Sequence, residues 1–122
     1  MRELIIIGFG GFIGAILRFL ISSFFSKYGF PLGTLTVNII GSFILGFFMY
    51  LSLYTSISPD YKLFLATGFC GALTTFSTFS YETFLFIEEG LFLKALLNIF
   101  LNISLCLISV YLGRALALLL VK

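Results

Sequence analysis

Histidine is absent from the 122-residue sequence, and charged residues are scarce. Without an imidazole the chain has no histidine base, no histidine metal ligand and no histidine pH switch. Only 10% of the residues are charged and 61% are hydrophobic, whereas about 25% of the residues of an average soluble domain are charged. Such a composition cannot cover a water-soluble surface, so it predicts a membrane protein. The net charge of +2 is too small to indicate binding to nucleic acid.

Cysteine is also rare. The two cysteines, Cys70 and Cys106, lie in apolar runs and at no spacing that is typical of metal ligands. We therefore expect them to pack as small hydrophobic side chains rather than to form a redox pair. At the N-terminus, Arg2 is the one basic residue before a long apolar run, a pattern that predicts a retained helix rather than a cleaved signal peptide.

Four long apolar segments are separated by short polar stretches that contain glycine or proline. At about 20 residues per transmembrane helix, the chain has room for about four spans in one domain. We expect helices over about residues 4–25, 32–54, 61–87 and 91–121. The predicted fold is a single four-helix transmembrane domain over residues 1–122, in the all-α membrane class.

Basic residues are distributed almost evenly between the two ends of these spans. When each intramembrane arginine is counted with the nearer end, four basic residues lie on the side of the termini and three on the other: Arg2, Lys62, Arg114 and Lys122 against Arg18, Lys27 and Lys94. Orientation normally follows an excess of basic residues on the cytoplasmic side. Two alternatives follow: the small excess still fixes one orientation, or oppositely inserted copies pair about a two-fold axis in the membrane plane.

The first segment carries closely spaced small residues and one charge. Gly10 and Gly14 are four residues apart, a spacing that lets two helices approach closely. Arg18 lies about 10 Å from the end of the helix, where a charge is costly unless it reaches water. The side chain either snorkels to the membrane surface or has an electrostatic role in an aqueous vestibule.

Amide side chains recur in the second and fourth segments. Asn38 shares a helix face with Thr34 and Ser42, because these residues are spaced by four. An amide is harder to satisfy within its own helix than a hydroxyl, so Asn38 is either an interhelical clamp or a donor that lines a pore. Asn98 and Asn102 have the same spacing in the fourth segment, which indicates a second polar stripe.

The third segment contains a hydroxyl-rich stretch, residues 71–80, at membrane depth. We expect the helix to break near residues 71–78. A break there costs several kcal/mol per unsatisfied peptide group unless protein, water or an ion replaces the lost partners, so it usually lines a site. Freed carbonyl oxygens would suit a hard cation such as Na⁺.

Phe76 and Phe79 either pack in the core or turn their electropositive ring edges to an anion. Glu82 could cap the helix, pair with an arginine or face a vestibule.

Three blocks of the sequence resemble, in order, the signature blocks of the Fluc (CrcB) fluoride channels. They are residues 10–18 (GGFIGAILR), 33–43 (GTLTVNIIGSF) and 71–82 (GALTTFSTFSYE). The four-span layout and the length also match, so the resemblance covers essentially the whole chain. This chain departs from the family where Ala72 replaces a common second glycine and where Phe19 replaces a common tyrosine.

The resemblance implies a passive fluoride-selective channel and not an enzyme. The channel would export cytoplasmic fluoride across the cell inner membrane, as a multi-pass protein that confers fluoride resistance. It would be an antiparallel, dual-topology homodimer with two pores. A structural sodium ion, which is not transported, would be held at the dimer centre by backbone carbonyls that map to Gly71 and Thr74 of each subunit.

The resemblance also implies roles for individual side chains. Those expected to line the fluoride pore are Asn38, Phe76, Ser77, Thr78, Phe79, Asn98 and Asn102. The family often has hydroxyls where this chain has Asn98 and Asn102, although amide N–H groups could also donate to an anion. Arg18 corresponds to the vestibule arginine and Glu82 to the acidic residue after the phenylalanine motif.

Two alternatives concern function and assembly. A small dual-topology drug or cation transporter has a similar size and four spans, but it would need an acidic residue deep in its first helix for proton coupling. This segment has only Glu3, at its entrance. The antiparallel partner could be a second copy of the chain or a homologue of it.

Overall fold

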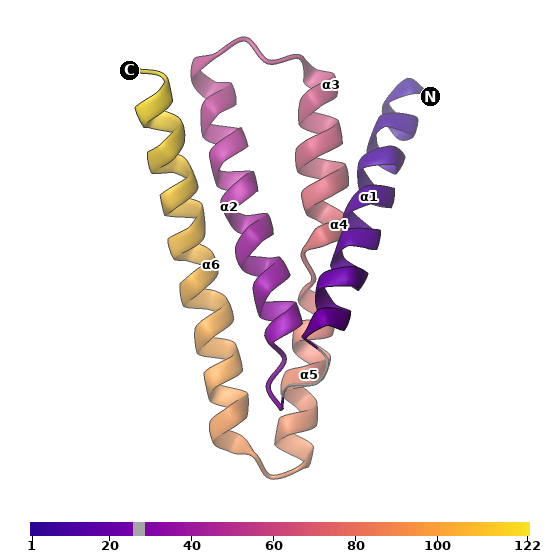
Figure 1. Ribbon diagram of the computed structural model, residues 1–122, viewed down its shortest axis with the longest axis vertical. Coiled ribbons are helices and arrows are strands. Elements are labelled where there is room, and N and C mark those ends of the chain that lie inside the picture. Colours follow the sequence, from indigo (N-terminus) through magenta and orange to yellow (C-terminus); the bar gives the residue numbers. More distant parts are fainter. Residues whose placement is uncertain (26–28) are drawn as a thin grey trace.

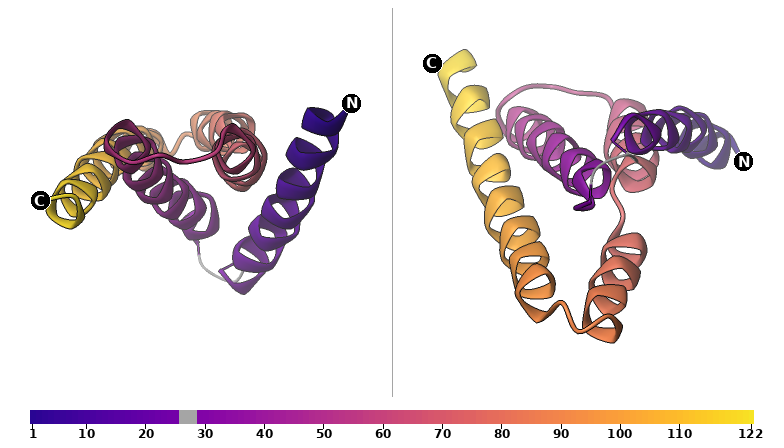
Figure 2. Two further views of the ribbon diagram at one scale, coloured as in Figure 1. Left: turned by 90° about the horizontal axis from the view of Figure 1, so that it is seen from above. Right: turned by 60° about the horizontal axis from the view of Figure 1, so that its bottom comes forward.

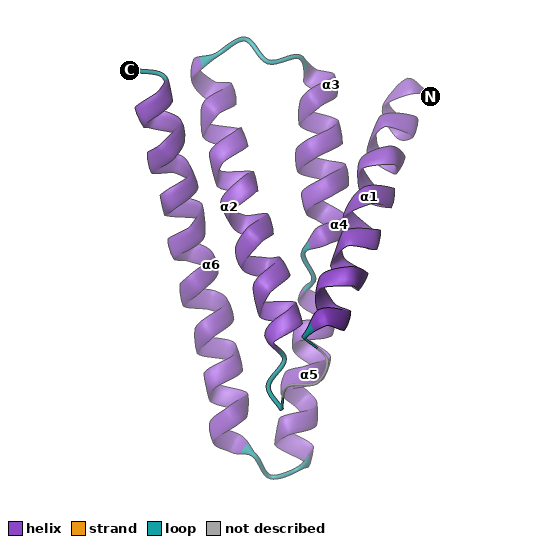
Figure 3. Cartoon of the chain, viewed as in Figure 1, coloured by secondary structure: helices purple, strands orange, loops and turns teal. Residues whose placement is uncertain are grey.

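The computed structural model describes residues 1–25 and 29–122, and these residues form helices and connecting loops (Figure 3). Four helical stretches are long and apolar enough to cross a membrane: α1 (Arg2–Phe24), α2 (Leu32–Tyr54), the interrupted third span (Pro59–Glu88) and α6 (Phe92–Leu120). The predicted all-helical membrane class is therefore confirmed. Lys27, which was counted among the basic residues, lies outside the described residues.

The spans run roughly alongside one another (Figure 1). Both termini and the connection from α2 to α3 (Pro59–Lys62) lie at one end of the molecule, and the connection from α5 (Phe76–Glu88) to α6 lies at the other. Helix α2 packs along α6, while α1 packs against the first half of the third span (Figure 2). The second half of that span packs mainly against α6. The third span therefore changes its main partner where it is interrupted.

Glycines bring the packed helices into backbone contact. A Cβ atom at Gly46 of α2 would lie 2.6 Å from the carbonyl oxygen of Val110 in α6, and one at Gly113 would overlap the Phe43 carbonyl. In α1, a Cβ at Gly10 or Gly14 would overlap backbone carbonyls of the third span. The spacing of Gly10 and Gly14 thus serves close helix packing, as the sequence predicts.

The third span has four parts. A short α3 (Pro59–Lys62) leads into a π-helical stretch (Leu63–Cys70) and then α4 (Gly71–Leu73). Thr74 and Thr75 are extended, with ψ angles of 158° and 123°, and α5 (Phe76–Glu88) follows. The break is narrower than the predicted 71–78. Gly71 keeps helical dihedral angles, and the Thr75 hydroxyl caps α5 by accepting from the Thr78 N–H at 3.1 Å.

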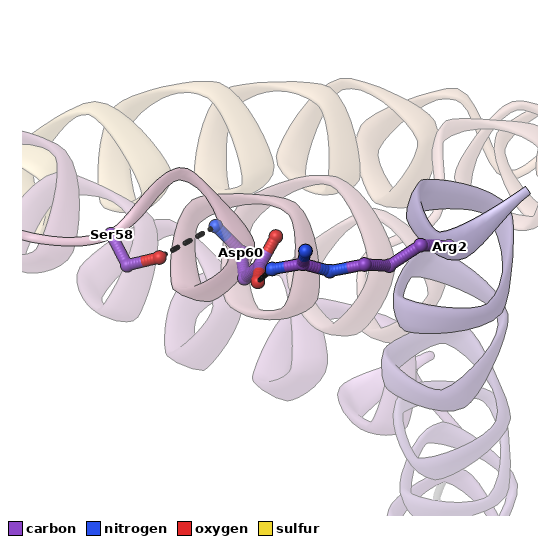
Figure 4. Close-up of polar contacts among 3 residues, drawn as sticks. All are labelled: Arg2, Ser58 and Asp60. Atoms are coloured by element: carbon purple, nitrogen blue, oxygen red, sulfur yellow. Dashed lines mark hydrogen bonds and ion pairs between the residues drawn. The ribbon is translucent and has the colours of Figure 1, made fainter.

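An ion pair joins the first and third spans at the end of the molecule that carries the termini. The Arg2 guanidinium donates to the Asp60 carboxylate, and the Ser58 hydroxyl accepts from the Asp60 N–H (Figure 4). Because the Arg2 side chain is exposed, we expect this pair to contribute little to stability.

The distribution of side chains is that of a protein in lipid. Large apolar residues cover the outer faces of the helices, for example Phe9, Phe12, Phe100 and Leu107. Several buried side chains are instead polar: Thr34, Thr83, Asn98, Asn102 and Ser109. Unpaired polar groups are costly in hydrocarbon, so these residues must find partners within the protein.

Candidate functional site

The candidate site is centred on the break at Thr74 and Thr75, where the third span loses helical hydrogen bonds. Asn38 of α2 supplies replacements for both backbone groups of Thr75. Its Oδ1 accepts from the Thr75 N–H at 2.8 Å, and its Nδ2 donates to the Thr75 carbonyl at 3.2 Å. The Thr74 hydroxyl donates to the Cys70 carbonyl at 2.9 Å. The break is thus stabilised by one side chain within it, Thr74, and by one from the facing helix α2, Asn38.

Arg18 of α1 supports the break from the other side. Its Nε donates to the Ala72 carbonyl at 2.9 Å, although the two residues are 54 positions apart. The guanidinium therefore lies at the carbonyl end of the helical half that precedes the break, where a cation is electrostatically favoured. Sequence reasoning missed this contact, since neither alternative for Arg18 included a backbone carbonyl of the third span.

A chain of hydrogen bonds, here called the amide chain, runs from Asn38 through Asn102 and Asn98 to Thr83. Asn38 Nδ2 donates to Asn102 Oδ1 at 3.0 Å, and Asn102 Nδ2 donates to Asn98 Oδ1 at 3.1 Å. Asn98 Nδ2 then donates to Thr83 Oγ1 at 2.9 Å. The Thr83 hydroxyl closes the chain on the Phe79 carbonyl at 2.8 Å. The chain therefore begins at the break and ends in α5, by way of α2 and α6.

The amide chain has a fixed direction. A backbone N–H can only donate, so the Thr75 N–H turns Asn38 Oδ1 toward itself and Asn38 Nδ2 toward Asn102. Asn102 and Asn98 then each accept through Oδ1 and donate through Nδ2. Asn102 Nδ2 also donates to the Asn98 carbonyl at 2.9 Å. The amide hydrogens in these bonds go to protein acceptors within this chain, and a contact of the three asparagines with fluoride stays a prediction.

The two phenylalanines of the motif have unequal environments. Their ring centroids are 5.4 Å apart and the ring planes are inclined by 59°. Phe79 is only 8% exposed, whereas Phe76 is 78% exposed. The two rings are therefore in contact, but the Phe79 ring packs inside the chain and the Phe76 ring projects from its surface.

Hydroxyl groups gather at the start of α5, immediately after the break. The Thr75 Oγ1 lies 3.2 Å from the Ser77 hydroxyl and 3.2 Å from the Thr78 hydroxyl. Backbone N–H groups of the first turn point toward the same end of the helix and give it a partial positive charge. Ser77 and Thr78, both predicted pore residues, thus lie where an anion is electrostatically favoured.

A cavity of about 350 Å³ lies against the break. It brings together the backbone positions predicted for a cation, Gly71 and Thr74, with both phenylalanines of the motif. Other lining residues include Asn38, Asn102, Ser42, Cys70 and Cys106, whereas the predicted pore residues Ser77, Thr78 and Asn98 do not line it. Among the described residues, no group of three or more cysteine, aspartate or glutamate side chains could hold a metal ion. A cation here would need carbonyl and hydroxyl oxygens.

Glu82 is separate from this cavity. It borders a second cavity of about 360 Å³ together with Ser22, Gly33 and Thr34. One carboxylate oxygen, Oε1, is buried and has no hydrogen-bond partner among residues 1–25 and 29–122. The structure therefore does not place Glu82 in the cavity that contains the phenylalanine pair.

Comparisons with known proteins agree with the resemblance. The sequence matches the family described as CrcB-like protein, Camphor Resistance (CrcB), over residues 5–114. A protein of Methanocaldococcus jannaschii named fluoride-specific ion channel FluC is 65% identical over 119 residues, which cover 97% of this chain and 96% of that protein. Relatives of the same name are 60% identical in Methanococcus aeolicus, covering 97% of each chain, and 50% identical in Shewanella baltica, covering 95% of this chain and 96% of the relative. Since the family match and these relatives extend over nearly the whole sequence, this chain belongs to the CrcB family.

Proposed function

We propose that this protein is a passive, fluoride-selective ion channel and not an enzyme. The observation that carries the proposal is the cavity at the break, where both phenylalanines of the motif lie with Thr75, the residue whose hydroxyl caps the positive end of α5. The relatives named fluoride-specific ion channel support the choice of ion.

Selectivity would come from replacing the water shell of a small, strongly hydrated anion. A pore must offer enough donors to strip the water and yet bind weakly enough to release the ion. Hydroxyls of Ser77 and Thr78 and the edges of Phe76 and Phe79 are suitable donors, because none carries a full positive charge. Asn38 and Asn102 also line the cavity and could exchange a protein acceptor for the ion.

We propose that the channel is an antiparallel homodimer with dual topology and two pores. Four spans are too few to enclose a wide pore, and the basic residues show almost no orientation bias. The 78% exposed ring of Phe76, beside the exposed Gly71, is a suitable surface for a second copy to cover. Each pore would then take rings from both subunits.

A structural sodium ion at the centre of the dimer is part of this proposal. In an unbroken helix the Thr75 N–H would bond to the Gly71 carbonyl, but it bonds to Asn38 instead. This arrangement frees the Gly71 carbonyl from its usual partner, and Thr74 lines the same cavity. Carbonyls of Gly71 and Thr74 from two subunits would supply the oxygen ligands that a hard cation prefers. Bound sodium would tie the two broken helices together and would not be transported.

Passive conduction would protect the cell from fluoride. Hydrogen fluoride crosses membranes and dissociates in a more alkaline cytoplasm, so the trapped anion can leave across the cell inner membrane without an energy source. Fluoride efflux from liposomes that hold the purified protein tests this function. We expect efflux well above that of empty liposomes. Efflux of an aromatic cation driven by a proton gradient, without fluoride efflux, would favour the small transporter instead.

A further inference from the structure

Helix α5 needs an external anchor. Two extended residues precede it, so the rotation of α5 is not set by a continuous helical backbone. Its buried residues are Phe79 and Thr83, which are one turn apart and share a face. Helix α6 is the main partner of α5, and α2 contacts it only slightly. The position of Phe79 must therefore depend on how α5 is attached to α6.

Thr83 and Asn98 provide that attachment. Among the described residues, the bond from Asn98 Nδ2 to Thr83 Oγ1, at 2.9 Å, is the side-chain hydrogen bond that links α6 to α5. The Thr83 hydroxyl also donates to the Phe79 carbonyl at 2.8 Å, so one oxygen is bonded to both α6 and the backbone of the ring-bearing residue. Asn98 is 0% exposed, and its amide therefore has no water to turn to.

We propose that Thr83 and Asn98 are positioning residues, which set the place of the Phe79 ring in the fluoride pathway without contacting the ion. The proposal rests on the proposed function. The hydroxyl hydrogen of Thr83 is committed to the Phe79 carbonyl, and an amide hydrogen of Asn98 is committed to Thr83. For Asn98, this positioning role through Thr83 replaces the pore-lining role that is expected from the sequence. The amide chain thereby couples the break, which Asn38 stabilises, to the Phe79 ring.

Three substitutions separate the hydroxyl from the shape of the side chain. Thr83→Val keeps the shape and removes the hydroxyl, Thr83→Ser keeps the hydroxyl, and Asn98→Leu removes the amide. Ser104→Ala is the matched control, since the Ser104 hydroxyl donates only to the Phe100 carbonyl of its own helix. In liposome efflux, we expect Thr83→Val and Asn98→Leu to lower the fluoride rate about tenfold or more, because each removes two buried side-chain hydrogen bonds. Thr83→Ser and Ser104→Ala should stay within about twofold.

The background of Phe79→Ile distinguishes positioning from direct contact with the ion. If Thr83 acts through the ring, Thr83→Val produces no further loss of rate once the ring has been replaced. If Thr83 donates to fluoride itself, the two losses multiply and the proposal is overturned. Equal rates for Thr83→Ser and Thr83→Val would overturn it as well.

A second measurement does not depend on conduction. With 4-fluorophenylalanine at position 79 alone, ¹⁹F NMR reports the surroundings of the ring. We expect Thr83→Val to shift or broaden the resonance and Thr83→Ser to leave it in place. An unchanged resonance in Thr83→Val would refute the positioning role even if the variant were slow. A wild-type protein that does not conduct fluoride would refute the proposed function and leave this readout intact.

Discussion

Asn38 holds the peptide groups of Thr75 from both sides, accepting from the N–H at 2.8 Å and donating to the carbonyl at 3.2 Å. A single amide thus replaces two helical hydrogen bonds at the break. This is the geometry of an interhelical clamp between α2 and the third span. It also explains why the extended pair of threonines can lie at membrane depth.

The direction of the amide chain makes Asn38→Asp a sharp test. An aspartate can still accept from the Thr75 N–H, but it cannot donate to the Thr75 carbonyl or to Asn102 Oδ1. We expect this variant to lose about 2–3 kcal/mol of unfolding free energy in detergent and to stop conducting. Ser52→Ala on the same helix, where the exposed hydroxyl donates to the Met49 carbonyl of α2 itself, should leave the melting temperature almost unchanged. A melting temperature for Asn38→Asp equal to that of the wild type would contradict the clamp.

The contact of Arg18 with Ala72 can be compared with that of another arginine. Arg18→Met keeps most of the apolar stem and removes the bond to the Ala72 carbonyl, so we expect a loss of about 1.5–3 kcal/mol. Arg114 instead lies over the Tyr50 ring, 5.5 Å from its centroid, and Arg114→Met should cost only about 0.5–1 kcal/mol. Thermal unfolding of both variants measures the difference. Equal losses of unfolding free energy in the two variants would show that the bond from Arg18 to the Ala72 carbonyl does not contribute more than the contact of Arg114 with Tyr50.

Gly41 gives a test of packing at the break. A Cβ at Gly41 would overlap the Thr74 side-chain methyl, Cγ2, so Gly41→Ala should push Thr74 out of place and cost about 1–3 kcal/mol. Gly8→Ala meets open space and should be neutral or stabilising by up to about 1 kcal/mol. Adding Thr74→Ser to Gly41→Ala removes the overlapping methyl, so the double variant should recover the stability and the fluoride efflux of the wild type. No rescue by Thr74→Ser would show that the overlap is not the cause.

The phenylalanine pair is tested by Phe76→Ile and Phe79→Ile. Isoleucine is apolar but has no electropositive ring edge, so both variants should slow fluoride efflux while the proposed dimer survives. Size-exclusion chromatography serves as the control for assembly. Unchanged efflux in both variants would remove the rings from the mechanism.

Much of the architecture was predictable from local sequence. Apolar segments of spanning length predict the membrane helices, and the hydroxyl-rich stretch after Gly71 predicts a break. The observed break, at Thr74 and Thr75, lies within the predicted residues 71–78 but is shorter, because the Thr75 hydroxyl caps α5 and that helix starts at Phe76. A capping residue is hard to distinguish among several neighbouring threonines and serines.

Long-range contacts at the site were less predictable. Arg18 meets Ala72, and Asn98 meets Thr83, only after four helices have packed. Thr83 could have been noticed, because it follows Phe79 by one turn and therefore shares its face. Its proposed role depends on the hydrogen bond that its hydroxyl oxygen accepts from Asn98 of α6, and helical periodicity does not predict a contact between two helices. Asn38, in contrast, could be recognised as a clamp candidate, since a lone amide in a span needs a partner outside its helix.

Electrical recording from planar bilayers tests the central claim of passive fluoride conduction most directly. With fluoride at unequal concentrations on the two sides and chloride equal, we expect a current that reverses at the equilibrium potential of fluoride and needs no proton gradient. Reversal at zero voltage, or no current above that of a protein-free bilayer, would contradict the account.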